Sequence, residues 1–301
     1  MKRLLGHTTA PRIAVLMTCF NRRETTLECL RALASSVGLD ATQIHAVLVD
    51  DGGTDGTAQA VRTEFAWVDV VVREGGLFWC RGMHLAFDRA LTQGFDFYLW
   101  LNDDTVLRPD AVSRMLACAA EMLVRAPNPV IVIGNTVDGV TGAHTYGGER
   151  RRSRSNAFKF VRVAPSETAQ PCDTLTGNIV LISAEAAVRV GNLDPGFEHA
   201  MGDTDYGLRA RKLGVELWIA PGVHGTCSHN PVSNTYVDAS LPLKQRWHRM
   251  LHRKGLPWRS WLIFTRRHTG VMWPMYFAWP YVKLVLSSRP SSITSRRKLP
   301  F

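Results

Sequence analysis

Residues 95–105 read FDFYLWLNDDT, an apolar run with an acidic end. The run of large apolar and aromatic side chains predicts a strand that is buried on both faces, as in a parallel sheet. Asn102, Asp103 and Asp104 come where that strand should end. Because ligands of open α/β folds bind at the carboxyl edge of the strands, these three residues are candidates for a binding site.

Asp103 and Asp104 are adjacent carboxylates that repel each other and need a counter-charge. A hard divalent cation supplies one, because Mg²⁺ takes one or two carboxylates and completes its shell with substrate phosphates. The alternative is a polar turn before a helix that begins near residues 109–110, since Asp and Asn are common in such turns. The stretch alone leaves both interpretations open.

Strand and helix patterns alternate along the chain around this stretch. Further buried strands are expected at residues 12–17, 45–49, 68–73, 129–134, 179–182 and 215–220. Helices are expected at residues 24–34, 57–65, 77–91, 110–124 and 184–190, and a later one opens near Asp203. This alternation predicts an α/β fold: a Rossmann-like, doubly wound, mostly parallel sheet with helices on both faces.

The composition is that of a folded α/β protein with an unusual charge distribution. The chain has 301 residues, 46% of them hydrophobic, and six scattered cysteines that suggest reduced thiols of a cytosolic protein. Residues 1–12 contain no apolar segment of signal-peptide length. Residues 244–301 hold 13 of the 36 Lys and Arg and none of the 26 Asp and Glu, so residues 1–243 have a net charge of −3. A nearly neutral body therefore carries a strongly basic tail.

A second basic stretch, residues 147–162, reads as an exposed loop or hairpin. It lacks interleaved aromatics and any known nucleic-acid-binding module, so a solvated face is the preferred interpretation and no nucleic-acid partner is expected.

Other polar clusters follow the predicted strands. Thr18 and Asn21 follow the first strand, and Asp50 and Asp51 follow the second. The carboxyl ends of parallel strands share one edge, so these side chains should lie near residues 102–104. Another cluster, Asp203 and Asp205, opens the later helix, where amide dipoles favour an anion.

The order of these motifs resembles the family-two glycosyltransferases, which have the GT-A fold and use nucleotide sugars. The matching segments are TCFNR at 18–22, VDDGGTDGT at 49–57, NDD at 102–104, TGN at 176–178 and the segment 203–209. The resemblance covers about residues 12–230. Two positions depart from it: Asn102 stands at the first Asp of the Asp-x-Asp motif, and Gly202 precedes Asp203 where the family has a Glu-Asp pair.

The resemblance implies a site for a nucleotide-diphosphate sugar and a divalent cation. Asp104 would bind Mn²⁺ or Mg²⁺, with His224 or His229 completing the metal shell. The residues assigned to the nucleotide sugar are Thr18, Asn21, Asp50, Asp51, Gly76, Arg81, Asn102 and Asp103. Among these, Asp50 and Asp51 would accept hydrogen bonds from the base of a UDP- or dTDP-linked donor.

The implied reaction is inverting transfer to a glycan or lipid-linked acceptor, in the synthesis of cell-surface polysaccharide or glycolipid. Asp203 aligns with the family's general base, and Asp205 is close enough to leave the choice between them open.

Three other classes of protein share part of this pattern. A sugar nucleotidyltransferase would need a glycine-rich loop directly after the first strand to grip a triphosphate, and residues 18–22 contain no glycine. A dinucleotide-dependent oxidoreductase would need a G-x-G-x-x-G motif after an early strand, which is missing. A catalytically weakened GT-A protein that binds at a membrane surface remains open because of Asn102 and Gly202.

The tail, residues 244–301, is expected to form helices that are separate from a catalytic domain at 1–243. It interleaves basic residues with Trp, Tyr and Phe, and its charge-free run at 270–282 is shorter than the roughly 20 residues needed to cross a bilayer. Basic and aromatic side chains suit the surface of an anionic membrane, which predicts a cytoplasmic protein at the inner face of the cell membrane. The alternative is a helical cap whose aromatics are core residues.

Overall fold

The computed structural model describes residues 11–38, 44–153, 157–229 and 233–287. The chain divides into two compact units, Met1–Asn230 and Pro231–Phe301, which are described separately. This division comes ahead of the boundary expected at residue 243.

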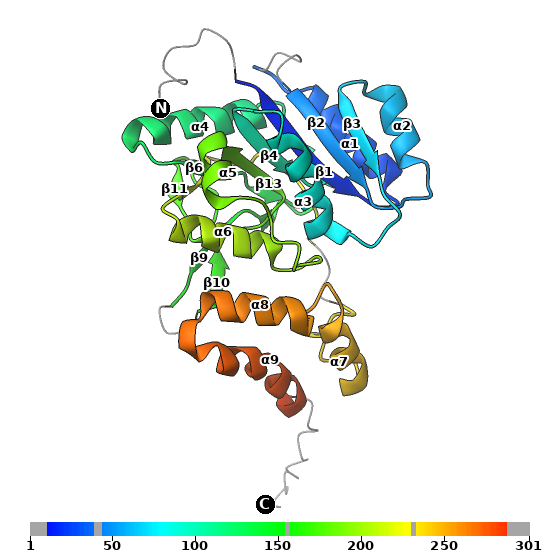
Figure 1. Ribbon diagram of the computed structural model, residues 1–301, viewed down its shortest axis with the longest axis vertical. Coiled ribbons are helices and arrows are strands. Elements are labelled where there is room, and N and C mark those ends of the chain that lie inside the picture. Colours follow the sequence, from blue (N-terminus) through cyan, green and yellow to red (C-terminus); the bar gives the residue numbers. More distant parts are fainter. Residues whose placement is uncertain (1–10, 39–43, 154–156, 230–232, 288–301) are drawn as a thin grey trace, which may run out of the picture. The chain divides into compact units, whose positions relative to one another are not determined.

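The first unit is built on an eight-stranded sheet (Figure 1). Its strands, in spatial order, are β11 (Gln170–Pro171), β14 (Glu216–Ile219), β6 (Val130–Ile133), β13 (Ile179–Ser183), β4 (Phe97–Leu101), β1 (Ile13–Cys19), β2 (Ile44–Asp50) and β3 (Val68–Val72). The neighbours β4, β1, β2 and β3 are parallel to one another. The stretch quoted first is therefore the central strand β4, all of whose residues are buried.

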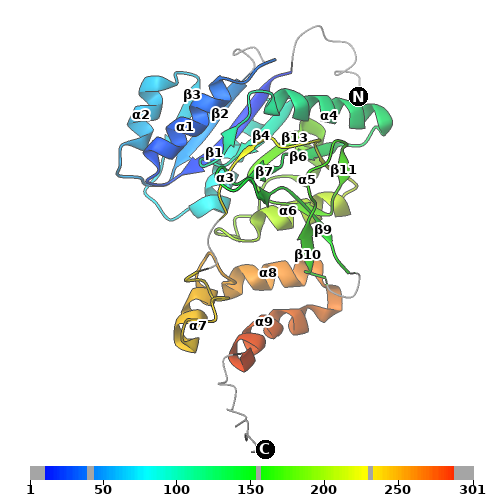
Figure 2. The same cartoon turned by 180° about the vertical axis from the view of Figure 1, so that it is seen from behind.

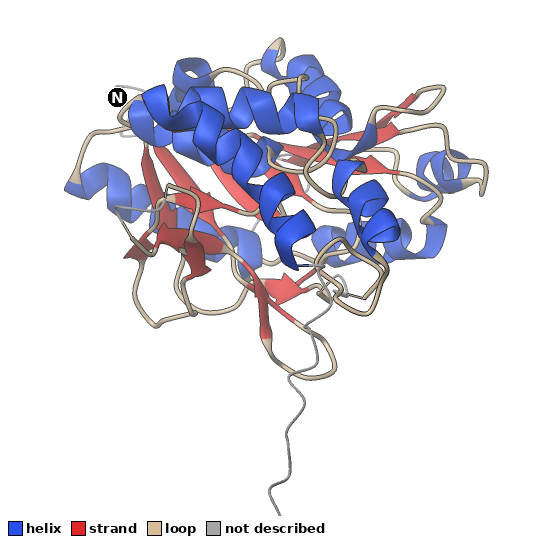
Figure 3. Ribbon diagram, turned by 90° about the horizontal axis from the view of Figure 1, so that it is seen from below, coloured by secondary structure: helices blue, strands red, loops and turns tan. Residues whose placement is uncertain are grey.

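Helices cover both faces of this sheet, as the alternating pattern predicts (Figure 3). One face packs against α1 (Arg23–Ala34), α2 (Thr57–Glu64) and α4 (Ala111–Arg125), through alternate strand residues such as Val15 and Leu99. The other face packs against α3 (Phe78–Leu91), α5 (Ala184–Val190) and α6 (Gly202–Lys212). There the rings of Phe87, Trp100 and Tyr206 form a buried aromatic cluster. Figure 2 gives the reverse view of the same layers. The structure thus confirms the predicted fold class.

The direction of β13 is a feature that the alternating pattern does not reveal. This strand lies between β4 and β6 and runs antiparallel to both, with Leu181 opposite Leu99 and Val132. The chain between β6 and β13 passes through two smaller sheets before it returns. As a result the chain enters β13 from the edge at which β4 ends, directly after Gly177 and Asn178.

The excursion supplies all three strands of one small sheet and two of the four strands of the other. One has the order β10-β9-β12 and consists of β9 (Gly148–Arg151), β10 (Phe160–Arg162) and β12 (Thr174–Leu175). The other has the order β5-β15-β7-β8 and consists of β5 (Val106–Leu107), β15 (Gly225–Thr226), β7 (Thr136–Val137) and β8 (His144–Tyr146). Strands β9 and β10 form an antiparallel hairpin, which is one of the two forms expected for the basic stretch at 147–162.

The second unit is helical, as the tail pattern predicts. Its elements are α7 (Leu243–Leu251), α8 (Trp258–His268), the short 3₁₀ helix η2 (Gly270–Met272) and α9 (Trp273–Ser287). The indole of Trp261 donates to the carbonyl of Phe277 at 3.1 Å, and the hydroxyl of Tyr281 donates to the carbonyl of Leu256 at 2.8 Å. These bonds tie α9 to α8 and to the segment before it. Within the described ranges, no helix is both long and apolar enough to cross a membrane. The last 14 residues of the tail, 288–301, lie outside the described part of the chain.

Candidate active site

The acidic end of β4 lies beside the loop that follows β1, and one guanidinium joins them. Arg22 Nη1 is 3.1 Å from Asp103 Oδ1 and 2.7 Å from Asp104 Oδ2. Asp103 is buried, and its other oxygen, Oδ2, has no hydrogen-bond partner among the described residues. Burial raises the pKa of Asp103 to about 7, with the charge of Arg22 acting against this rise. Two carboxylates therefore converge on one positive group, the guanidinium of Arg22.

This position fits a divalent cation that shares its shell with a ligand. Oxygen atoms of two carboxylates already meet there, and Mg²⁺ usually needs only one or two carboxylates when substrate phosphates supply other ligands. A complete metal site made of three His, Cys, Asp or Glu side chains is not found in the part of the chain that the structure describes.

The two histidines that were candidates for the metal shell have other partners in this structure. His224 is fully buried, and its Nδ1 accepts from the backbone N–H of Asn135 at 3.3 Å. Burial lowers the pKa of His224 to about 4. His229 is exposed and receives a hydrogen bond from Arg162. Among the described residues, the side chain that approaches Asp104 from this segment is instead Cys227, whose Sγ is 3.5 Å from Asp104 Oδ1.

Residues at and just beyond the carboxyl ends of β1 and β2 hold the loops of the nucleotide side in place. The buried Thr18 donates to the carbonyl of Val49 at 3.1 Å, and Asn21 Oδ1 accepts from Thr54 at 2.7 Å. Asp50 Oδ1 accepts from the N–H of Gly53 at 2.8 Å. These bonds connect the two loops and fix the carboxyl edge of β1 and β2.

Asp51 fixes the start of α3 in a similar way. Its two oxygens accept from the N–H groups of Leu77 and Phe78 at 2.9 and 2.7 Å. Gly76 precedes this turn with φ of +92°, a conformation that favours glycine. Asp50 and Asp51 are both buried, so their first role in the structure is to shape the loops that a nucleotide would meet.

Arg81 points toward a different loop. Its Nε donates to the carbonyl of Pro195 at 2.9 Å, and its Nη2 is 3.7 Å from Glu198. The side chain therefore joins α3 to the loop that leads into α6.

Asp203 lies across a two-residue bridge from the acidic end of β4. Asp203 Oδ2 accepts from the N–H of Gly177 at 3.1 Å, and the N–H of Asn102 donates to the carbonyl of Asn178 at 3.0 Å. Because Gly177 and Asn178 are consecutive, the candidate base and the acidic motif share one short segment. Burial raises the pKa of Asp203, and hydrogen bonds from Thr204 and Gly177 oppose the rise.

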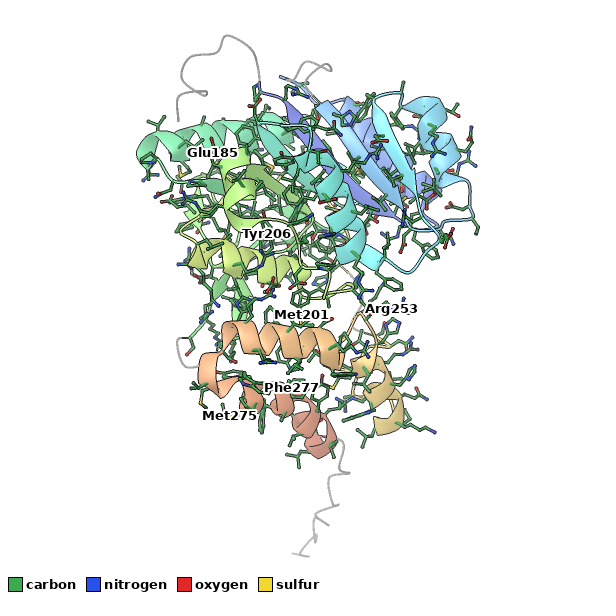
Figure 4. The ribbon with its side chains drawn as sticks, in the orientation of Figure 1. Glu185, Met201, Tyr206, Arg253, Met275 and Phe277 are labelled. Atoms are coloured by element: carbon green, nitrogen blue, oxygen red, sulfur yellow. The ribbon has the colours of Figure 1, made fainter. Side chains whose placement is uncertain are left out.

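Asp205 has a different environment from Asp203, although it lies only two residues away. It is fully buried and pairs with Arg209 at 2.8 Å. Arg209 in turn donates to the carbonyls of Val190 and Asn192. This carboxylate is already neutralised inside the fold, whereas Asp203 is half-buried at the start of α6. Figure 4 marks Met201 and Tyr206, which bracket the two carboxylates along the chain.

The sequence patterns assign no role to three residues of this site. Trp79 Nε1 donates to Asn102 Oδ1 at 2.7 Å, and its ring lies so close to Gly177 that a Cβ there would overlap it. Arg22 belongs to a quoted motif, but its two ion pairs depend on the approach of β1 to β4. Phe20, the residue before Asn21, leaves 55% of its side chain exposed at the same edge. An aromatic residue beside Asn at a strand end is the one signal that could have identified Phe20.

Comparisons with known proteins agree with this arrangement. The model of the family "Glycosyl transferase family 2" matches residues 14–175, more than half of the chain. A search of curated protein sequences finds no match.

Solved structures share the fold at low sequence identity. The mannosyltransferase PcManGT from Pyrobaculum calidifontis, in complex with GDP-Man and Mn²⁺, superposes with a TM-score of 0.54 at 17% identity, over 93% of this chain and 74% of that one. Residues 1–349 of S. aureus TarS superpose with a TM-score of 0.52 at 13% identity, over 94% of this chain and 76% of that one. The same TarS fragment in complex with UDP gives a TM-score of 0.51 at 13% identity, over 87% and 73% of the two chains. With the family match over the strands and loops described above, the chain belongs to glycosyl transferase family 2.

Proposed function

We propose that this glycosyltransferase transfers a sugar from a UDP- or dTDP-linked donor to a glycan or lipid-linked acceptor, with inversion and with help from Mn²⁺ or Mg²⁺. The observation that carries the proposal is the bridge from Asp203 through Gly177 and Asn178 to the end of β4. It connects Asp203, whose pKa is raised by burial, to the end of β4, where Asp103 and Asp104 converge on the guanidinium of Arg22.

The acidic end of β4 would take the donor. Asp104, with Asp103 beside it, would hold the cation, which offsets negative charge on the departing nucleoside diphosphate. The exposed ring of Phe20 offers a stacking surface for the nucleotide base, next to the loops that Asn21, Asp50 and Asp51 fix.

Asp203 would act on the acceptor. The acceptor oxygen attacks C1 of the sugar, its proton passes to Asp203, and the bond from C1 to the diphosphate oxygen breaks. A single displacement of this kind inverts the anomeric centre. Glu-Asp of the family becomes Gly202-Asp203 here, so Asp203 supplies the base from this segment alone.

A nucleotide-binding screen tests the proposal on the full chain. A ligand that binds only the native state raises the melting temperature, so UDP and dTDP should raise it more in the presence of Mn²⁺ than in chelator. GDP and ADP serve as controls. Failure of every nucleoside diphosphate to bind would contradict the proposal. Binding without hydrolysis or transfer of any nucleotide sugar would instead support a GT-A protein that has lost catalysis.

We also propose that the second unit rests on the anionic inner face of the cell membrane. Helix α9 of this unit carries apolar side chains on two different faces. The backbone carbonyl of Phe277 and the hydroxyl of Tyr281 bond toward α8 and its preceding segment. The side chains that are exposed at helical spacing are Met275, Trp279, Val282 and Leu286. Figure 4 shows Phe277 between α8 and α9, and Met275 on the outer side of α9.

The charge of this unit favours an anionic surface. Residues 239–301 contain no Asp or Glu, and each Lys or Arg near an anionic bilayer contributes about 1 kcal/mol. Of the tail aromatics, Trp261 and Phe264 are core residues, as the alternative interpretation expects, but Trp258 and Trp279 are exposed. A core role therefore accounts for only part of the aromatic pattern.

A further inference from the structure

A group of polar side chains beside Asp203 takes no part in the donor site. It lies on the sheet β10-β9-β12, where Arg162, Glu149 and Thr174 are direct neighbours across three strands. Directly opposed residues point to the same face of a sheet. Thr174 donates to the carbonyl of Thr204 at 3.0 Å, so this face looks onto the first turn of α6, where Asp203 lies.

Glu149 lies on this face within the electrostatic reach of Asp203. Burial raises the pKa of Glu149, the charge of Asp203 raises it further, and the charge of Arg162 opposes the rise. Glu149 also lies directly opposite Thr174, which donates to the carbonyl of Thr204, the residue after Asp203, so a second carboxylate from β9 shares the surroundings of the candidate base.

Arg162 is held in position by neutral groups. Its Nη2 is 2.8 Å from His229 Nε2, and its Nη1 donates to the carbonyl of His144 at 3.4 Å. Among the described residues, no carboxylate lies within ion-pair distance of this guanidinium. Its positive charge is therefore not neutralised by a direct partner, although its position is fixed.

His229 adds a donor and a ring to the same group. Because Nε2 accepts from Arg162, the proton of a neutral ring belongs on Nδ1, which is then a donor. The imidazole lies 5.3 Å from the ring of Tyr146. Arg162 and His229 are exposed, and Tyr146 is half-buried, so a ligand can reach all three.

The hairpin around these residues adds positive charge. Residues 144–166 contain six Lys and Arg but a single acid, Glu149. Exposed Arg151, Arg152 and Lys159 extend the positive field beyond Arg162. A field of one sign draws in ligands of the opposite sign.

We propose that Arg162 and His229 bind an oxyanion carried by the acceptor, with its reacting hydroxyl at Asp203 and a neighbouring hydroxyl on Glu149. This proposal rests on the glycosyl transfer proposed above and names the acceptor class: an acidic glycan or a sugar phosphate. The fork of Arg162 matches phosphate and carboxylate oxygens, and the ring of Tyr146 offers an apolar face to a sugar. The basic hairpin then has a role in acceptor binding rather than being only a solvated face.

The test measures binding of three monosaccharides of similar size to the full chain by ligand-observed NMR. The probes are glucose 6-phosphate, glucuronate and neutral glucose, at one ionic strength. The acidic probes should bind and glucose should not. Arg162→Gln should weaken the acidic probes about tenfold or more, the loss of one charge-assisted hydrogen bond. Arg152→Gln, a matched change at an exposed hairpin arginine, should leave binding close to that of the wild type, and so should Asp104→Ala at the donor site.

Several results would overturn the proposal. If glucose bound as tightly as the two acidic probes, the site would not recognise an oxyanion. Equal weakening by Arg152→Gln and Arg162→Gln would reduce the hairpin to a diffuse basic surface. Loss in Asp104→Ala with retention in Arg162→Gln would place the probe in the donor site.

A second measurement separates this proposal from the proposed function. Arg162→Gln should bind UDP with Mn²⁺ as the wild type does, which also shows that the variant is folded. If the wild type binds no nucleotide but binds the acidic sugars through Arg162, the donor assignment fails and the oxyanion site stands. Tighter binding of glucose 6-phosphate than of glucuronate identifies phosphate as the oxyanion, and the reverse order identifies a carboxylate.

Discussion

The indole N–H of Trp79 donates to the side-chain oxygen of Asn102 at 2.7 Å. Asn102 stands at the position of the first Asp in the Asp-x-Asp motif, and here its oxygen is already engaged by the fold. The same indole packs against Gly177, the residue that holds Asp203. Trp79 therefore connects the acidic end of β4 to the candidate base.

We expect Trp79→Phe to loosen this connection while it keeps an aromatic ring against Trp100. Loss of the hydrogen bond to Asn102 should lower the free energy of unfolding by about 1 kcal/mol and weaken binding of UDP with Mn²⁺. Urea unfolding and calorimetry measure the two effects. Trp67→Phe, which alters an indole packed on Phe65, is the control and should leave nucleotide binding unchanged. Equal nucleotide affinity in Trp79→Phe and the wild type would contradict the connection.

Asp104→Ala should remove the response of nucleotide affinity to Mn²⁺. The variant lacks one of the two carboxylates that would bind the cation. Transfer should fall by roughly 100-fold or more, because a cation contributes several kcal/mol to such a step. Isothermal titration with and without Mn²⁺ checks the binding. Asp88→Ala, at an exposed position on α3, is the matched control. Full activity of Asp104→Ala in chelator would show that the metal assignment is wrong.

The rate of transfer should fall on the acid side at a higher pH than an ordinary aspartate would give. Burial raises the pKa of Asp203, and a base takes a proton only when it is ionised. As the pH falls through the raised pKa, Asp203 becomes protonated and transfer stops. The measurement is kcat against pH with saturating donor. Asp203→Asn should abolish transfer but keep donor affinity, since the base acts on the acceptor. An acid limb at the pH of an ordinary aspartate would contradict the assignment.

Asp205→Asn should act on stability rather than on chemistry. Removing one partner of a buried ion pair leaves Arg209 uncompensated, which should lower the free energy of unfolding by about 3 kcal/mol. Asp203→Asn should cost less, because an amide oxygen can still accept from Gly177. Urea unfolding of the two variants gives the comparison. If Asp205→Asn is as stable as the wild type but inactive while Asp203→Asn is active, the two roles are exchanged.

The central strand and the acidic end of β4 were predictable because each signal is contiguous in the sequence. Five large apolar residues precede the acidic motif in β4, and burial on both faces follows from that run. The motif at 49–57 likewise places Asp50 at the last position of β2 and Asp51 directly after it.

The parts that were not predictable depend on contacts between distant segments. The antiparallel direction of β13 has no local signature, since a short apolar run reads the same in either direction. Glu149 reaches the surroundings of Asp203 only because β9 pairs with β12. The burial of His224 and the pairing of Asp205 with Arg209 are tertiary facts of the same kind, and a sequence pattern shows only that the residues are present.

The last prediction concerns the outer face of α9. If charge alone bound the chain to anionic vesicles, high salt would release it. Insertion of apolar side chains into the bilayer adds a contribution to the binding affinity that high salt does not remove. Trp279→Glu should therefore weaken binding of the full chain to vesicles of phosphatidylglycerol and phosphatidylcholine by roughly tenfold or more, since burying one large apolar side chain contributes about 1.5–3 kcal/mol. Co-sedimentation at low and high salt measures the electrostatic and the apolar contributions to vesicle binding. Val124→Glu and Val188→Glu change valines of α4 and α5 that are 80% and 83% exposed, and they should bind as the wild type does. If all three variants bind alike, the outer face of α9 does not enter the bilayer, because an identical added charge on the first unit would then explain the whole effect.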